Sequence, residues 1–443
     1  MRILVVTNGY PPRGQWGTEF YTAQLVATLR ERGVEIAVLH PDRSSDRPRY
    51  TVEQSKGTDG TPVYLLHNPG AADKRFDDSY ENEEVDRRFG VILDEWQPDL
   101  VHFTYLLWGL SIGMPRVARE RGVATVATLT DYGLLCHRGQ MYDWKLERCE
   151  GPHPASVCAR CIRTPSRHDD PPLTVLAKRL AIGALAAVGG AGKVVVESDV
   201  ARREERVGRA LESIQELIAP TRVLADKFRS LGVDESKLTE LVYSIDSRPL
   251  ELARAEPPRA PVVFGFLGQF TPHKGLETLL EAVRIAQTRL PESVEDWAVR
   301  LYGKPAGGRH RLFAQRVFAG NLGPRVQVMD PFPPHRAPEI LSTLHAVLIP
   351  SEWDENAPLT CLQARAAGIP LIGTNVRGIA EVVPGPEYGR LVDVGDAEGL
   401  ADAMREVILG RLGRHPQPTL PMTLEEHADR VAAIHARALG ARL

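Results

Sequence analysis

The chain has 443 residues, of which 43% are hydrophobic and 25% charged, with a formal net charge of −3 at pH 7. This length predicts two or three domains with cores of their own, and the average composition excludes a disordered or low-complexity protein. The near-neutral charge provides no global basic field, so nucleic acid is not expected as a partner.

The first residues, 1–7, are typical of a buried strand and lack the charged start, long apolar stretch and cleavage site of a signal peptide. The longest apolar stretch without a charge, 180–192, is too short to cross a bilayer and is interrupted by glycines. Five cysteines without a secretory signal indicate a reducing compartment. We therefore expect a cytoplasmic protein.

Strand-like and helix-like segments alternate through residues 1–250. The strand-like segment 3–7 is followed by the amphipathic segment 19–32 and by a second strand-like segment, 35–39. The same alternation recurs at 100–103, 114–121, 123–128, 193–197, 217–220 and 221–231. Such alternation predicts parallel strands joined by helices, so we expect residues 1–250 to form a Rossmann-like, doubly wound α/β domain.

The second half of the chain repeats this pattern. Residues 251–261 combine prolines and charges without an apolar period, which predicts a linker, and a new buried strand starts at residue 262. We expect a second Rossmann-like domain over 262–415, facing the first across a cleft. Residues 416–443 contain an amphipathic helix for which packing on either domain, including back on the first, is left open.

The segment 349–370 predicts a strand, a polar loop and a helix that starts at Pro358. The unpaired amides of the first helical turn would attract a diphosphate, and Glu355 precedes them in a loop that we expect to be exposed, where it could accept sugar hydroxyls. The alternative is an acidic helix cap followed by an exposed glutamine. The donor-binding candidates here are Asn356, Ala357, Pro358, Leu359 and Gln363.

A second loop, 268–275, also follows a predicted strand and precedes a helix. Parallel strands bring such loops to the same edge of a sheet. Within this loop, Lys274 can supply positive charge to a departing phosphate, and Gln269 lies beside it as a further donor-binding candidate. The alternative for Lys274 is a solvated lysine near a turn.

The order and spacing of several motifs resemble one known family, the retaining glycosyltransferases of family 4, which have the two-domain GT-B architecture. The resemblance implies that the loop containing Gly17 approaches the donor diphosphate and that His102 and Asp131 face the acceptor. The segments that carry it are 8–12, 17–19, 101–102, 128–131, 217–221, 244–246, 274–275, 350–351, 355–358, 368–370 and 378–383.

The chain departs from this family at three positions. Gln363 occupies the second position of the usual glutamate pair, Gln269 replaces the usual loop arginine, and Thr130 precedes Asp131 where a histidine is frequent. The amide of Gln363 can still bond ribose hydroxyls, but acceptor-side proton chemistry is left to His102 and Asp131. The alternative for His102 is a buried histidine bonded to backbone.

The resemblance implies transfer of a hexose-type sugar from a nucleoside diphosphate, UDP or GDP, to a small-molecule, glycan or lipid-linked hydroxyl acceptor, with retention of configuration. Glu355 and Lys274 are the donor-side catalytic candidates. The chain has no Asp-x-Asp, so no cofactor is expected for transfer. Two alternatives remain: a catalytically weak homologue that binds sugar nucleotide, and an interaction protein that acts through its cysteines.

Four cysteines lie in a predicted insert, 132–170, with the spacing C-x12-C-x8-C-x2-C. This spacing predicts a structural zinc site, with His137 or His153 as substitute ligands; free thiols, disulfides and an iron–sulfur cluster are the alternatives. The insert directly follows Asp131 and is expected to border the acceptor. The four candidate ligands are Cys136, Cys149, Cys158 and Cys161.

The stretch 160–209 has a surplus of arginine and lysine around an apolar segment. It allows at most a peripheral membrane contact. The favoured alternative is an amphipathic helix packed on the sheet with a solvated basic face.

Overall fold

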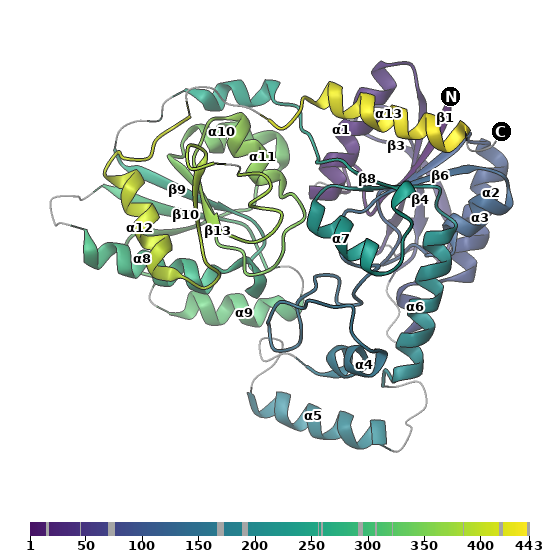
Figure 1. Cartoon of the computed structure of the whole chain (residues 1–443), viewed down its shortest axis with the longest axis horizontal. Coiled ribbons are helices and arrows are strands. Elements are labelled where there is room, and N and C mark those ends of the chain that lie inside the picture. Colours follow the sequence, from purple (N-terminus) through teal and green to yellow (C-terminus); the bar gives the residue numbers. More distant parts are fainter. Residues whose placement is uncertain are drawn as a thin grey trace.

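The computed structural model contains two α/β domains, seen side by side in Figure 1. The described residues are 1–14, 17–44, 46–69, 76–165, 172–187, 194–255, 257, 260–290, 296–305, 308–320, 322–383, 385–415 and 420–440.

The first domain is built on an eight-stranded sheet of order β3-β4-β2-β1-β5-β6-β7-β8, in which only the edge strand β3 pairs antiparallel. Its strands are β1 (Arg2–Val6), β2 (Glu35–Asp42), β3 (Val52–Lys56), β4 (Pro62–His67), β5 (Leu100–Phe103), β6 (Ala124–Thr128), β7 (Glu216–Ala219) and β8 (Leu238–Glu240). Its helices are α1 (Gly17–Glu31), η1 (Asp77–Ser79), α2 (Glu83–Trp96), α3 (Met114–Glu120), α6 (Glu197–Glu212), α7 (Arg222–Ser230) and η2 (Glu235–Lys237).

The central strand β1 shows why helices cover both faces of this sheet. Ile3 and Val5 pack into one apolar cluster, whereas Leu4 and Val6 pack into another. Because successive side chains of a strand point to opposite faces, a strand that is apolar throughout needs a covering layer on each side.

The second domain has an all-parallel sheet of order β11-β10-β9-β12-β13-β14. Its strands are β9 (Val262–Leu267), β10 (Trp297–Tyr302), β11 (Val326–Met329), β12 (Ala346–Ile349), β13 (Leu371–Thr374) and β14 (Gly389–Val392). Its helices are η4 (Pro272–Lys274), α8 (Leu276–Arg289), α9 (Gly308–Ala319), η5 (Pro334–Arg336), α10 (Ala337–Ser342), α11 (Leu359–Ala366) and α12 (Ala397–Ile408). The predicted fold class, two doubly wound α/β domains, is confirmed.

Two segments connect the domains. The 3-10 helix η3 (Arg248–Arg254), which overlaps the start of the predicted linker, packs against α10 and α11 of the second domain. Residues 256, 258 and 259 of that linker lie outside the described part. The C-terminal helix α13 (Leu424–Gly440) returns to the first domain, where it packs against α1, β6 and β7.

Helix α4 (Ala155–Arg163) lies within the predicted insert, and α5 (Pro172–Ala187) follows the insert in the chain; the two helices pack differently. Helix α4 packs against α6, whereas α5 lies apart from both sheets at the lower edge of Figure 1. The expectation of a helix packed on the sheet is therefore wrong for α5. No helix in the described ranges combines the length and apolar character needed to span a bilayer.

Candidate active site at the strand ends of the second domain

The predicted donor loops follow two neighbouring strands. Strands β9 and β12 pair in parallel, so the loop that leads into η4 and the loop that leads into α11 emerge at the same edge of the sheet. Gly275 brings the two loops together: its φ is +67°, and a Cβ there would lie 1.7 Å from the carbonyl oxygen of Pro350. The close approach therefore requires glycine at this position.

Lys274 and Glu355 form an ion pair between these loops. The Lys274 Nζ lies 2.6 Å from Glu355 Oε1, which also accepts a 2.5 Å hydrogen bond from the Ser351 hydroxyl. Glu355 is only 4% exposed, so the expectation of an exposed loop is wrong. Burying a carboxylate costs hydration unless polar partners replace the water, and Lys274 and Ser351 are these partners for Glu355.

The backbone around Glu355 is held in an unusual conformation. Gly378 has a φ of +87°, and a Cβ at this residue would lie 1.8 Å from the carbonyl oxygen of Glu355. Ala357 has a φ of +48°, a left-handed conformation that costs about 1–2 kcal/mol in a residue other than glycine. The loop is therefore fixed by its neighbours rather than free to move with solvent.

Helix α11 starts one residue later than predicted. Pro358 is its N-cap, Leu359 is the first helical residue, and no side chain caps this end. Amides of an uncapped first turn can accept an anion. Gln363 lies one turn further along and is half-buried, as is Gln269 in the other loop, whereas Ala357 is buried.

Asn356, a predicted donor ligand, has a different set of partners. Its amide nitrogen donates to the carbonyl oxygen of Leu129 at 3.0 Å, and its amide oxygen accepts from the Thr221 hydroxyl at 3.2 Å. Both partners belong to the first domain, so the side chain bridges the domains at the edge of the loop. Its side chain is thus engaged between the domains, and the role of Asn356 toward the donor stays a prediction.

The acceptor-side candidate Asp131 follows β6 of the first domain. Its Oδ1 accepts a 2.7 Å hydrogen bond from the Gly133 amide. Burial raises the pKa of Asp131 to about 6, although this hydrogen bond and one to the Tyr105 side chain act in the opposite direction. The carboxyl group therefore titrates close to neutral pH, where it can exchange a proton.

The loop before α1 folds around Glu19. The Asn8 side chain donates to Glu19 Oε1 at 2.8 Å, and Cβ atoms at Gly9 and Gly14 would lie 3.2 Å and 2.8 Å from the Glu19 Cγ. Gly17, in contrast, is exposed, and a Cβ there would meet nothing within 4 Å. Its role toward the donor stays a prediction.

His102, predicted to face the acceptor, lies in the core instead. It is 0% exposed, its Nε2 is 2.8 Å from the Thr128 hydroxyl, and its Nδ1 is 3.0 Å from the His435 Nε2 of α13. Burial lowers the pKa of His102, so the ring is neutral. His102 therefore contacts the C-terminal helix α13 and helps to hold it on the first domain. We remove His102 from the catalytic candidates.

Comparison with known proteins follows the same division of the chain. The family model described as glycosyl transferase 4-like domain matches residues 17–242, half of the chain, and the model described as glycosyl transferases group 1 matches residues 248–418. The chain belongs to the glycosyltransferase 4-like family. The two matches correspond to the two domains of the structure.

The curated relatives match only part of this chain. A D-inositol 3-phosphate glycosyltransferase from Corynebacterium glutamicum (strain R) is 30% identical over 188 residues, which are 42% of this chain and 44% of that protein. The protein of the same name from Rhodococcus jostii (strain RHA1) is 31% identical over 204 residues, 43% of this chain and 44% of that protein. The chain thus spans less than half the length of these relatives.

Solved structures match over the whole chain. A sucrose-phosphate synthase from Thermosynechococcus elongatus aligns with a TM-score of 0.62 and 17% identity, over 99% of this chain and 97% of that one. Anabaena HepE in complex with UDP aligns with a TM-score of 0.59 and 13% identity, over 100% and 99%. These structural likenesses show that this chain has the GT-B fold.

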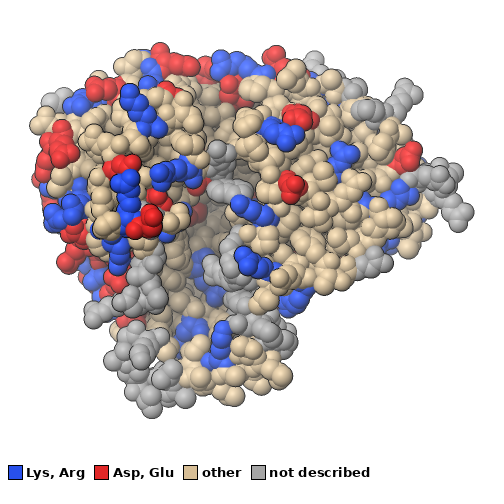
Figure 2. Space-filling view, turned by 180° about the vertical axis from the view of Figure 1, so that it is seen from behind, with Lys and Arg blue, Asp and Glu red and all other residues tan. Residues whose placement is uncertain are grey.

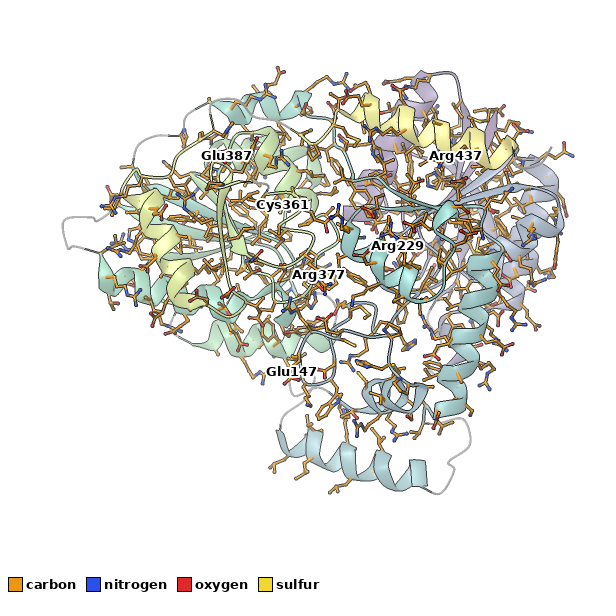
Figure 3. The ribbon with its side chains drawn as sticks, viewed as in Figure 1. Glu147, Arg229, Cys361, Arg377, Glu387 and Arg437 are labelled. Carbon is orange, nitrogen blue, oxygen red and sulfur yellow. The ribbon has the colours of Figure 1, made fainter. Side chains whose placement is uncertain are left out.

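Contacts across the interdomain space were not anticipated from the sequence. Arg377 of the second domain lies 3.0 Å from carboxylate oxygens of both Glu150 and Asp354, near the centre of Figure 3. The Tyr142 hydroxyl donates to Glu352 at 3.3 Å. Figure 2 shows the surface hollowed between the domains, with Lys and Arg side chains (blue) along the hollow. No local pattern marks such pairs, because their members are far apart in sequence.

The four cysteines of the insert line one cavity of about 200 Å³. All four are free cysteines. Within the described ranges, no three His, Cys, Asp or Glu side chains are grouped so that they could hold a metal ion. The structure thus gives no support to the expectation of structural zinc, which stays a prediction. The four cysteines among the lining residues are Cys136, Cys149, Cys158 and Cys161.

Proposed function

We propose that this chain transfers a hexose from a nucleoside diphosphate sugar to a hydroxyl acceptor, with retention of the anomeric configuration. The observation that carries the proposal is the Lys274–Glu355 ion pair beside the uncapped start of α11. An uncapped helix start binds a diphosphate, and a neighbouring ammonium group stabilises the charge that develops as the diphosphate leaves.

On the donor side, two charged residues have different roles. Lys274 neutralises the departing phosphate, while the Glu355 carboxylate accepts hydroxyls of the sugar and orients the ring. As the bond from the anomeric carbon to the phosphate oxygen breaks, the sugar becomes oxocarbenium-like. The acceptor hydroxyl attacks from the same face, and its proton passes to the leaving phosphate oxygen. This order of events gives retention.

The acceptor side is supplied by the first domain. Asp131, with its pKa raised by burial to about 6, is suited to holding an acceptor hydroxyl through a hydrogen bond. The curated relatives are named for D-inositol 3-phosphate, which supports a small, hydroxyl-rich acceptor. For the donor, UDP is favoured over GDP because UDP is the nucleotide in the HepE complex.

We further propose that transfer needs no metal cofactor. The role that a divalent cation plays beside a diphosphate is assigned to Lys274 and the α11 amides, because these groups supply positive charge to the same oxygens. Activity should then survive an excess of a chelator.

The proposal is tested by incubating the protein with UDP-, GDP- and ADP-sugars and measuring the release of free nucleoside diphosphate, with the product anomer read by NMR. Lys274→Ala should lower kcat/KM by about 100-fold, since it removes a charge felt mostly in the transition state. Lys56→Ala, an exposed lysine on β3, is the matched control and should leave kcat/KM unchanged. Equal rates in the two variants would show that the phosphate is held elsewhere, and an inverted product would contradict retention.

A further inference from the structure

Helix α5 presents large apolar side chains to solvent. Leu173, Leu176 and Leu180 are 83%, 56% and 68% exposed, whereas Val175 of the same helix is 3% exposed. Residues three, four and seven positions apart share one face of an α-helix, so the three leucines form a stripe, and Val175 lies on another side. The helix therefore buries Val175 on one side and presents an apolar stripe to solvent on another.

The charge around this stripe differs in sign from that of the protein as a whole. Residues 155–187 contain five Lys and Arg and two Asp, a net charge of +3, while the whole chain carries −3. The helices α4 and α5 themselves contain no Asp or Glu. A basic helical segment with an exposed leucine face has the composition of a helix that lies in a membrane interface.

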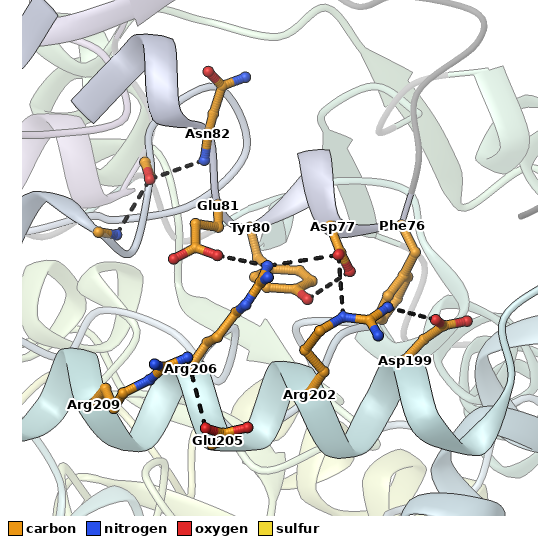
Figure 4. A network of polar contacts seen from close by, with 12 residues as sticks. Phe76, Asp77, Tyr80, Glu81, Asn82, Asp199, Arg202, Glu205, Arg206 and Arg209 are labelled. Atoms are coloured by element: carbon orange, nitrogen blue, oxygen red, sulfur yellow. Dashed lines mark hydrogen bonds and ion pairs between the residues drawn. The ribbon is translucent and has the colours of Figure 1, made fainter. Parts of the chain in front are cut away.

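Helix α4, the helix that precedes α5 in the chain, is held to the first domain. It packs against α6, and α6 is tied to η1 and to Glu81 by the ion-pair network of Figure 4. In this network Arg206 lies 2.6 Å from Glu81, and Arg202 lies 3.2 Å from Asp77 and 2.7 Å from Asp199. The insert that carries α4 starts directly after Asp131, and α5 follows it in the chain. A surface that binds through α5 would thus be connected to the acceptor side of the cleft.

We propose that α4 and α5 form a docking surface for an anionic lipid membrane. Leu173, Leu176 and Leu180 enter the headgroup region, where their apolar surface leaves water, and the basic side chains of the two helices contact anionic headgroups. This binding goes beyond the proposed transfer reaction and does not depend on it, because it requires only the helical surface.

The test is co-sedimentation of the full chain with vesicles of phosphatidylcholine alone and of phosphatidylcholine with phosphatidylglycerol. We expect binding to the anionic vesicles and at least about a tenfold loss in the triple variant Leu173→Ser, Leu176→Ser, Leu180→Ser, since three apolar side chains no longer leave water. The matched control replaces exposed leucines elsewhere. The control variant is Leu231→Ser, Leu252→Ser, Leu312→Ser, whose leucines are 41%, 77% and 39% exposed.

Circular dichroism of both variants verifies that they fold, and light scattering measures their mass. Loss of binding in the α5 variant but not in the control supports the proposal. Absence of binding by the folded wild-type chain overturns it, as does equal binding to neutral and anionic vesicles. A wild-type dimer that becomes a monomer in the α5 variant, without vesicle binding, would instead show that a second copy covers the stripe.

Discussion

The strand ends of the two domains are occupied in different ways. In the second domain, two short loops pack so tightly that Gly275 lies against the Pro350 carbonyl, and they close around the Lys274–Glu355 pair. In the first domain, the chain after Asp131 extends into the insert with its cavity and then into the exposed helix α5. The proposed donor side is thus fixed by close backbone contacts, which tolerate little change, whereas the proposed acceptor side includes a long segment outside the sheet.

The largest effect on activity is expected from substitution of Glu355 in the loop before α11. We expect Glu355→Gln to lower turnover by at least about 1000-fold, because the carboxylate that orients the sugar is lost while the bond from Ser351 is kept. Glu355→Ala should in addition lower the melting temperature, since Glu355 is 4% exposed and its loss leaves Lys274 without its partner. Nucleoside diphosphate release and calorimetry measure the two effects. Glu277→Ala, in the first turn of α8, is the control; loss of activity in both variants would contradict a specific role.

The second prediction compares glycines of the two domains. Gly275→Ala should destabilise the protein by at least about 2 kcal/mol, because a left-handed φ and a collision with the Pro350 carbonyl coincide. Gly17→Ala should leave the free energy of unfolding within about 0.5 kcal/mol, since its Cβ meets no atom within 4 Å. Urea denaturation measures both. Equal destabilisation would mean that the loops of the two domains are equally constrained.

The third prediction concerns pH. Because burial raises the pKa of Asp131 to about 6, the folded state holds this proton more tightly than the unfolded chain does, so the carboxyl costs stability as pH rises from about 4 to 6. Asp131→Asn should therefore gain stability relative to wild type above pH 6 and gain none at pH 4. If the carboxylate binds the acceptor, wild-type kcat/KM should fall below pH 6, and the variant should be slow and lack this transition. A variant with the wild-type pH profile would exclude Asp131 from the site.

The smallest expected effect on activity comes from His102. His102→Gln should keep kcat within about twofold, because the ring is fully buried and its two nitrogens lie within hydrogen-bond distance of Thr128 and His435. Its melting temperature should fall, since α13 loses an anchoring bond. Burial also lowers the pKa of His435 to about 4, so the stability due to the neutral pair should be lost as pH falls from 6.5 toward 4. A large loss of activity with unchanged stability would return His102 to the acceptor site.

Much of the molecule could be predicted from local sequence. The alternation of apolar and amphipathic segments indicated both sheets, and the glycine and proline positions around 272–275 and 355–368 indicated the loops that bring Lys274 and Glu355 together. These features depend on neighbouring residues, whose hydrogen bonding and periodicity are visible in the chain itself. The start of α11 differed by one residue only.

Only the tertiary structure showed which polar side chains are buried and which partners they have, because both depend on segments that are distant in the chain. The sequence could not show that Glu355 would be buried, that Asn356 would bridge to Leu129, or that α13 would cover His102. The same limit applies to α5. Its apolar residues fit a core helix as well as a surface helix, and only the folded structure shows that α5 lies apart from both sheets. Amino-acid order thus determined the fold and the donor loops, while long-range packing determined which polar groups remain available for chemistry.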